Sequence, residues 1–432
     1  MWPCFTHAAV MLEVLSGVQW LRSPYRFLER RLDRGELTFR VKLPVLGRCL
    51  VTGEPELIGQ IVRDKALIGG RGTQALRPVV GDDSLIVLEG DRHLEHRSVM
   101  LPLFFSADPS RHDALNRRWV DHELARLPRS TSFSGMDFVA RITLHVVIDL
   151  IFGDMPAAEH QRAFAVFTQW LASFRNPTVL FLKALHLDLG RHSPWGRFLL
   201  NRSAVHGFVR ERIAHTRQHP TPCALDGMLR SPAATGRLLS DDEAVSEIIT
   251  FILFGHDTSA AAIGWVFNDL LRDDAALERA AQEARLTSGE APDHPFIRSL
   301  IQESMRLSPV VVHLTRHAVA ATRVGPHAIA EGERVLPCMY LAHRNPAVFA
   351  DAGRFVAERF MQPSPSWKHA YFPFGLGQRL CAGMPLALRQ MVIILARILE
   401  TARLRLVAPD EVVAVRKMVL MVPAGGPEIA LA

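Results

Sequence analysis

The segment from Ser240 to about Arg272 is predicted to be one long helix, and it constrains the fold more than any other part of the sequence. Ser240 followed by Glu243 has the spacing of a capping box, which indicates where the helix begins. Roughly 32 residues at about 1.5 Å each give a rod on the order of 48 Å. Such a rod is long enough to cross the whole molecule.

A coiled coil or a membrane span would be the usual explanation for a helix of this length. Its middle argues against both, because it reads Phe254-Gly255-His256-Asp257-Thr258-Ser259. Glycine, aspartate and threonine are poor residues for a helix interior. Polar groups at the centre of a helix that crosses the core need a partner or a purpose, so this segment is a candidate functional site.

The rest of the chain is predicted to be mainly α with small β-sheets, folded as one domain over residues 1–432. Most of Asp91 to Leu286 has the periodicity of amphipathic helices, separated by Pro- and Gly-rich breaks. Alternation within Glu36 to Val51 predicts a small hairpin. Shorter strands are expected near Val310 to Arg316 and Arg334 to Tyr340.

The charge and the cysteines narrow the function classes. The net charge is +6, but the arginines are scattered through apolar patterns, without zinc-finger spacing or an RNA-binding aromatic signature, so nucleic acid is not the expected partner. Five widely spaced cysteines, an odd number, indicate a reducing compartment. No uninterrupted run of about 18 apolar residues is present. We therefore expect a cytoplasmic protein without a membrane segment.

The strongest local signal is the ten-residue stretch Phe374-Gly-Leu-Gly-Gln-Arg-Leu-Cys-Ala-Gly383. Its glycines allow a tight loop, and Cys381 stands just before a helix that begins near Pro385. Amides and the dipole at a helix start favour a thiolate, which is a good iron ligand. An isolated cysteine of this kind would be read as a small buried residue in a glycine-rich turn.

This stretch matches F-x-x-G-x-R-x-C-x-G at every fixed position, and the chain thereby resembles the cytochrome P450 family of haem-thiolate monooxygenases. The resemblance implies haem b (iron protoporphyrin IX) with Cys381 as its iron ligand and with Phe374 and Gly383 in the cofactor-binding loop. It also implies a triangular domain in which the haem lies between the long central helix and the cysteine loop.

Two further motifs extend the resemblance. Glu303 and Arg306 have E-x-x-R spacing on one helical face, although such pairs are common on surfaces. Arg359 follows in Phe355-Val-Ala-Glu-Arg-Phe, where Ala357 replaces the usual proline. In the family the matching glutamate and two arginines form a buried structural triad that braces the cysteine loop.

A third motif places His93 and Arg97 four residues apart on one predicted helix face. Without context, this pattern indicates a solvated basic face. The resemblance instead assigns both residues to the haem propionates, together with Arg316 and Arg379. The chemistry is consistent with this, because buried carboxylates need charge-assisted donors.

The polar middle of the long helix matches the family's oxygen-activating segment. Splitting O2 on haem needs two protons, which the hydroxyl of Thr258 can relay and the carboxylate of Asp257 can connect to solvent. The alternative is a helix kink in which Thr258 bonds to the backbone. Phe254 stands where the family usually has Ala or Gly, and we expect its ring to narrow the space above the iron.

The substrate is expected to be a hydrophobic small molecule of secondary metabolism, such as a terpenoid, steroid, fatty acid or polyketide. For each apolar residue that could face it, a place in the core is an equal alternative. By resemblance, the substrate-facing positions are Leu76, Ile86, Phe174, Leu253, Phe254, Val310, Val312 and Leu420.

The resemblance implies a bacterial-type, monomeric monooxygenase that hydroxylates or epoxidises its substrate with O2. Electrons would come from a separate ferredoxin- or flavodoxin-type donor, for which Arg111, Arg117, Arg118 and Arg389 are a candidate basic face. Two alternatives remain open. One is a peroxide-using haem-thiolate peroxygenase or isomerase, which typically lacks an acid–alcohol pair such as Asp257 and Thr258. The other is a non-catalytic haem-binding sensor.

Overall fold

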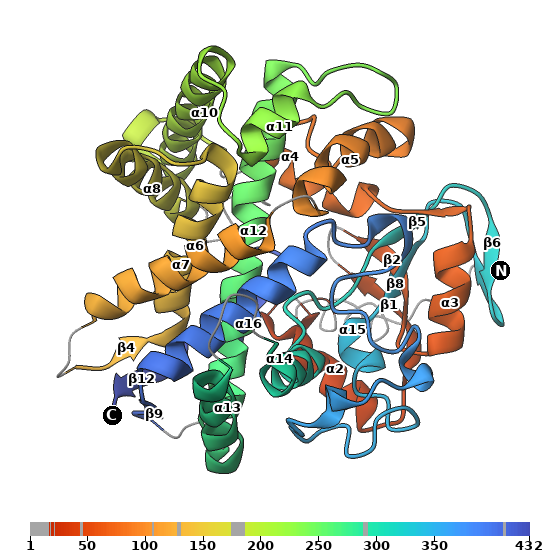
Figure 1. The fold of residues 1–432 in the computed structure, drawn as a ribbon. Coiled ribbons are helices and arrows are strands. Elements are labelled where there is room, and N and C mark those ends of the chain that lie inside the picture. Colours follow the sequence, from red (N-terminus) through yellow and green to blue (C-terminus); the bar gives the residue numbers. More distant parts are fainter. Residues whose placement is uncertain are drawn as a thin grey trace.

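Helices form most of the protein in the computed structural model, and small sheets lie at two of its sides (Figure 1). The structure describes residues 17–432 except 18, 21, 44–45, 106–107, 128–130, 174–185, 288–292 and 409–411. The α-helices are α2 (Pro24–Leu32), α3 (Pro55–Arg63), α4 (Arg77–Val80), α5 (Gly90–Phe105), α6 (Pro109–Ala125), α7 (Gly135–Phe152), α8 (Ala157–Ala172), α10 (Pro194–Gln218), α11 (Ala224–Arg230), α12 (Asp241–Leu270), α13 (Asp274–Leu286), α14 (Pro295–Leu307), α15 (Met339–Ala342) and α16 (Met384–Thr401).

The predicted long helix is α12, which runs through the middle of the molecule between α7, α10, α14 and α16 (Figure 1). Both hydrogen bonds of its capping box are present. The Glu243 N–H donates to Ser240 Oγ at 3.3 Å, and the Ser240 N–H donates to Glu243 Oε2 at 2.8 Å. The helix ends at Leu270, two residues before the predicted end.

Two apolar clusters pack on the two halves of α12. Its N-terminal half, through Leu253, joins the cluster that α5, α7, α8 and α10 complete, and its C-terminal half, from Ala260, joins a cluster with α7, α14 and α16. The polar segment 255–259 falls between the two clusters. The polar segment in the middle of this core-crossing helix therefore belongs to neither apolar cluster.

By length and composition, α12 is the one helix of the described chain that is apolar enough to cross a membrane. However, 72% of its most apolar 18-residue window is buried inside the protein, as in the core helix of a soluble protein.

The largest sheet has the strand order β1-β2-β8-β5-β3 and lies beside α3. Smaller sheets pair β4-β12-β9, β10-β11 and β6-β7. The strands are β1 (Thr38–Leu43), β2 (Gly47–Thr52), β3 (Leu67–Ile68), β4 (Phe133–Ser134), β5 (Arg316–Ala318), β6 (Thr322–Val324), β7 (His327–Ile329), β8 (Arg334–Pro337), β9 (Leu404–Leu406), β10 (Ala414–Lys417), β11 (Leu420–Pro423) and β12 (Glu428–Leu431).

The strand predictions were partly right. β1 and β2 form the expected hairpin, and β8 covers the first half of its predicted range before α15 begins. The strand predicted from Val310 is wrong, because only Arg316 at its end enters β5. The carbonyls of Val310 and Val312 instead accept hydrogen bonds from Met421 and Met339, which lie in two different elements, so no single ladder forms.

Candidate active site

The cysteine loop folds as two tight turns that lead into α16. Gly375 and Gly377 have φ of +82° and +66°, a region that residues with a Cβ rarely adopt. The Cys381 N–H donates to the Phe374 carbonyl at 2.9 Å and closes the loop. The backbone conformation of the loop thus explains the glycine spacing of the motif. The loop places the cysteine three residues before the start of α16.

Cys381 is exposed, whereas Cys49 and Cys338 are buried. Nevertheless, burial by the surrounding protein raises the pKa of its thiol, and this outweighs the opposite effects of the Gly383 N–H and of Arg97. The expected lowering by the helix start is therefore present but does not dominate. The sulfur is accessible, and a metal bound to it would remove its proton.

Four basic side chains from three separate elements form a cluster, and Arg97 connects this cluster to the sulfur. His93 and Arg97 come from α5, Arg316 from β5, and Arg379 from the 3₁₀ turn η6 (Gly377–Arg379). Burial, followed by the charges of Arg379 and Arg97, lowers the pKa of His93 to about 4. Burial and the charge of Arg316 lower the pKa of Arg379 to about 10.

These arginines are held by neutral groups. Arg379 donates to the carbonyls of Gly69, Leu85 and Leu88, and Arg316 donates to that of Leu376. Among the described residues, no carboxylate lies within ion-pair distance of Arg97, Arg316 or Arg379, although the charge of the nearby Glu89 acts to raise the pKa of Arg379. Three partly buried arginines beside one nearby carboxylate of the described chain leave an excess of positive charge, which suits a ligand that brings its own carboxylates.

The predicted triad residues are in contact. Arg306 Nε and Nη2 donate to Glu303 Oε2 and Oε1 at 2.7 and 2.8 Å, and Arg359 Nε lies 3.0 Å from Oε2. Glu303 and Arg306 are fully buried. The remaining N–H groups of Arg306 donate to three carbonyls, those of His343, Ala352 and Arg354.

His343 connects the triad to the cysteine loop. Its Nε2 accepts a hydrogen bond from the Phe372 N–H at 3.0 Å, and the Phe372 carbonyl in turn accepts from Gly375. Three hydrogen bonds therefore connect the buried arginine, through His343 and Phe372, to the loop that holds Cys381.

The middle of α12 holds its two predicted residues in different ways. Thr258 Oγ1 donates to the Phe254 carbonyl at 2.7 Å, the backbone contact of the kink alternative, which leaves its oxygen free to accept. Asp257 is buried, and its Oδ1 accepts from Lys417 Nζ at 2.7 Å, while His256 Nε2 lies 3.6 Å from the same oxygen. The side chain of Lys417 on β10 is 26% exposed, so the pair reaches from the core to solvent.

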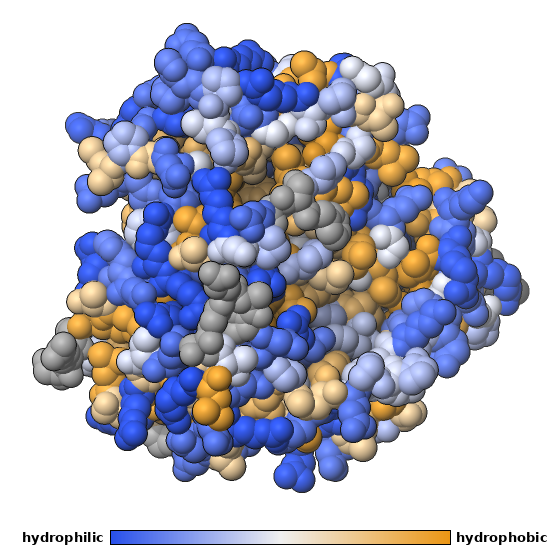
Figure 2. Space-filling model, viewed as in Figure 1, coloured by the Kyte–Doolittle hydropathy of each residue, from blue (hydrophilic) through white to orange (hydrophobic). Residues whose placement is uncertain are grey.

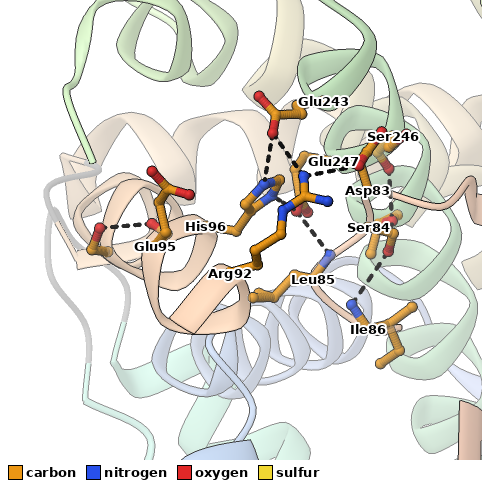
Figure 3. A network of polar contacts seen from close by, with 12 residues as sticks. Asp83, Ser84, Leu85, Ile86, Arg92, Glu95, His96, Glu243, Ser246 and Glu247 are labelled. Carbon is orange, nitrogen blue, oxygen red and sulfur yellow. Dashed lines mark hydrogen bonds and ion pairs between the residues drawn. The ribbon is translucent and has the colours of Figure 1, made fainter. Parts of the chain in front are cut away.

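A buried polar network fixes α5 against the first half of α12 (Figure 3). His96 Nδ1 lies 2.7 Å from Glu247 Oε1, and its Nε2 lies 3.4 Å from Glu243 Oε1. The Leu85 N–H also donates to Glu247, at 2.8 Å. The network thereby sets the position of the helix that carries His93 and Arg97.

The contribution of His96 to the stability of the protein is predicted to fall as the pH rises above about 6.5, the ordinary pKa of histidine. Burial acts to lower the pKa of His96, but the hydrogen bond and the charge of Glu247 outweigh this effect, so the pKa of His96 is raised. Burial also raises the pKa of Glu247. The folded state therefore keeps a proton that the unfolded chain releases, and the stabilisation is lost as the pH passes the raised pKa. Urea unfolding at several pH values would measure this. A His96→Gln variant with an equally steep pH dependence would contradict it.

A sequence profile described as Cytochrome P450 matches residues 48–428. The chain belongs to the cytochrome P450 family. Relatives from Mycobacterium tuberculosis include proteins described as cytochrome P450 138, 27% identical over 90% of this chain and 87% of the relative, and cytochrome P450 135B1, 24% identical over 96% and 89%.

Two solved P450 structures share the fold, each at 19% identity. The retinoic acid-bound cyanobacterial CYP120A1 has a TM-score of 0.80, with 94% of this chain and 93% of that chain covered. The haem domain of cytochrome P450DA has a TM-score of 0.83, with 95% and 93% covered. This P450 is therefore an oxidoreductase with a haem cofactor, a monooxygenase that uses O2 and electrons from a redox partner.

The residues of this P450 fit a haem. The Cys381 thiol is accessible, and the arginines of the basic cluster beside it form no ion pair with a carboxylate of the described chain. An axial sulfur ligand and donors for two propionates are the groups that a haem-thiolate site requires.

The predicted substrate positions divide into two groups. Leu76, Leu253, Val312 and Leu420 are at most 4% exposed within apolar clusters, which fits the core alternative. Ile86, Phe254 and Val310 are only partly buried and keep surface for a guest. Phe174 lies outside the described residues. Figure 2 shows apolar residues around a hollow near the middle of one face.

The basic docking face predicted from the sequence is largely neutralised in the structure. Each of its four arginines has a carboxylate within 4.0 Å: Arg111 with Asp154, Arg117 with Glu400, Arg118 with Asp149, and Arg389 with Asp113. The four arginines are at least partly exposed, but their acidic partners could not be predicted from the sequence.

Lys417 is the functional candidate that sequence reasoning missed. The signal was a lysine at the edge of the apolar stretch Met418-Val419-Leu420, from which only the apolar Leu420 was predicted to belong to the site. Lys417 follows a second cation, Arg416, beside this hairpin turn, and its counter-charge is the buried Asp257.

Proposed function

We propose that this P450 hydroxylates or epoxidises a hydrophobic small molecule, such as a terpenoid, steroid, fatty acid or polyketide. Cys381 holds the iron of haem b, and His93, Arg97, Arg316 and Arg379 bind the propionates. The observation that carries the proposal is the accessible Cys381 thiol beside a cluster of arginines that form no ion pair with a carboxylate of the described structure and outnumber the nearby Glu89. Electrons come from a ferredoxin- or flavodoxin-type donor, and the protein acts as a single-domain cytoplasmic monomer.

The bound haem supplies the activation of O2 and the transfer of one oxygen atom. Thr258 accepts and passes a proton above the iron, held in place by its bond to the Phe254 carbonyl. Asp257 forms the outer end of the proton path, and its ion pair with the partly exposed Lys417 holds the buried carboxylate in place. Ile86, Phe254 and Val310 exclude water and orient the guest.

The purified holoprotein, reduced and treated with carbon monoxide, tests the cofactor assignment. We expect a Soret band typical of thiolate ligation, and a band typical of imidazole ligation would overturn it. Substrates are then found by the low-spin to high-spin shift over steroids, terpenes and fatty acids. Product formed from peroxide alone, and none with NAD(P)H plus redox partners, would instead assign the peroxygenase class.

Asp257→Asn is predicted to lower kcat by about 10²–10⁴, the usual contribution of a positioned proton donor. The matched control is Lys417→Met, which removes the ion pair but keeps the carboxylate. If Asp257 delivers protons, only the first variant shows a large solvent isotope effect on product formation. Equal losses in both variants, without any isotope effect, would indicate that the pair acts only in folding.

Phe254→Ala is predicted to change the ratio of products more than the stability. The ring is partly exposed at the edge of an apolar cluster, so its removal creates a limited cavity beside the proposed haem face. The measurement is the regiochemistry of oxygenation for a guest that gives a spin shift. Unaltered product ratios would count against placing Phe254 above the iron.

A further inference from the structure

A cluster of histidines and carboxylates lies away from the proposed haem site, between α6, α7 and α8 at the left of Figure 1. His122 and Glu123 are neighbours on α6, and His145 comes from α7. One ligand atom from each of the three lies within 4.8 Å of the others. Glu123 and His145 are buried and His122 is exposed, so the cluster opens to solvent on one side.

A chain of hydrogen bonds sets the tautomer of His145. Asp149 Oδ1 lies 3.0 Å from His160 Nδ1, and His160 Nε2 lies 2.8 Å from His145 Nδ1. A carboxylate only accepts, so His160 Nδ1 carries the hydrogen and its Nε2, in a neutral ring, accepts from His145. His145 therefore carries its hydrogen on Nδ1 and a lone pair on Nε2.

That lone pair faces a second acceptor. His145 Nε2 lies 3.5 Å from Glu123 Oε1, so two electron-rich atoms face each other inside the protein. A cation placed between them would satisfy both. In metal sites, a ligating histidine typically donates its other ring N–H to a carboxylate or a similar group, which orients the ring, and the relay through His160 to Asp149 supplies this support.

The outer groups are also held in place. Arg141 Nε donates to Glu123 Oε2 at 2.6 Å, which leaves Oε1 for the cluster. Trp119 Nε1 donates to Asp149 Oδ2 at 2.6 Å, and the Trp119 ring stacks on His145 with centroids 4.0 Å apart. The two buried side chains are therefore preorganised, and only the exposed His122, whose Nε2 lies 3.4 Å from Arg126 Nη1, must adjust.

We propose that His122, Glu123 Oε1 and His145 Nε2 bind one Zn²⁺-type cation, with water in the fourth position. Two histidines and one glutamate are a ligand set that zinc accepts in tetrahedral sites with an open position. The cation would join α6 to α7, and through His160 to α8. Since α6 packs on α16, the site would stiffen the side of the molecule that carries the cysteine loop's helix.

The test is zinc binding to the holoprotein after removal of metals with a chelator, measured by calorimetry and elemental analysis. His215 and His219 form an exposed pair one turn apart on and just after α10, with ring centroids at 5.0 Å, and could bind zinc by themselves. All measurements are therefore made in a His219→Ala background. We expect one zinc per chain and a melting temperature that zinc raises.

Adding His122→Ala to this background is the decisive comparison. Because His122 is exposed, the variant should fold normally, while zinc affinity falls by at least about 10-fold and the thermal shift disappears. Zinc binding that His122→Ala leaves unchanged would be adventitious and would overturn the proposal. Absence of binding would overturn it too, and a proton shared between His145 and Glu123 would then explain their approach. Neither outcome depends on haem or on turnover.

Discussion

Arg306→Leu is expected to lower the free energy of unfolding by about 3–5 kcal/mol, the usual cost of removing one partner from a buried ion pair. The substitution leaves the Glu303 carboxylate inside the protein with only Arg359 and the Val356 N–H as donors. It also leaves three carbonyls without the guanidinium that now binds them. Urea unfolding followed by circular dichroism measures the loss, and haem content reports on the cysteine loop.

A neighbouring surface pair is the control for this prediction. Arg279 and Glu358 lie 2.8 Å apart, each about half exposed, and Glu358 is adjacent to the triad residue Arg359. Arg279→Leu should cost no more than about 1 kcal/mol, because exposed ion pairs contribute little. Arg306→Lys should remain strongly destabilising, since an ammonium cannot reproduce the five-donor fork. Comparable losses in Arg306→Leu and Arg279→Leu would refute a special role for the buried pair.

The parts of the fold that follow from local sequence were predicted well. The capping box at Ser240 and Glu243 places the start of the central helix, because both contacts lie within three residues. The tight turns of the cysteine loop could likewise be predicted, since its glycines occupy backbone conformations that other residues avoid. Local geometry and local sequence agree at these positions.

Contacts between distant segments could not be predicted. Asp257 and Lys417 are 160 positions apart, and His96 and Glu247 are 151 apart, so neither spacing nor periodicity pairs them. Periodicity also indicates that one side of a helix or strand is apolar without saying what covers it. This is why Leu253 and Phe254, neighbours in the sequence, differ in the structure, one packed in a cluster and the other at its edge.

Cys381→Ser is expected to abolish turnover while leaving the fold intact. Even loss of a group that only supports a metal ligand typically costs about 10–100-fold, so loss of the ligand itself should exceed about 100-fold. The side chain is exposed and belongs to no apolar cluster, so the free energy of unfolding of the haem-free protein should change by less than about 1 kcal/mol. The reduced, carbon monoxide-treated protein should lose the thiolate-type Soret band.

Cys223→Ser provides the matched control, since serine can keep the contact by which Cys223 caps α11 through the Asp226 N–H. This variant should retain both the spectrum and the turnover of the parent. The remaining described cysteines, Cys49 and Cys338, are buried, and burial raises the pKa of each thiol to about 12. Neither can replace Cys381 without opening the core. A thiolate-type spectrum that survived Cys381→Ser would therefore require a different axial ligand and would displace the site from the glycine-rich loop.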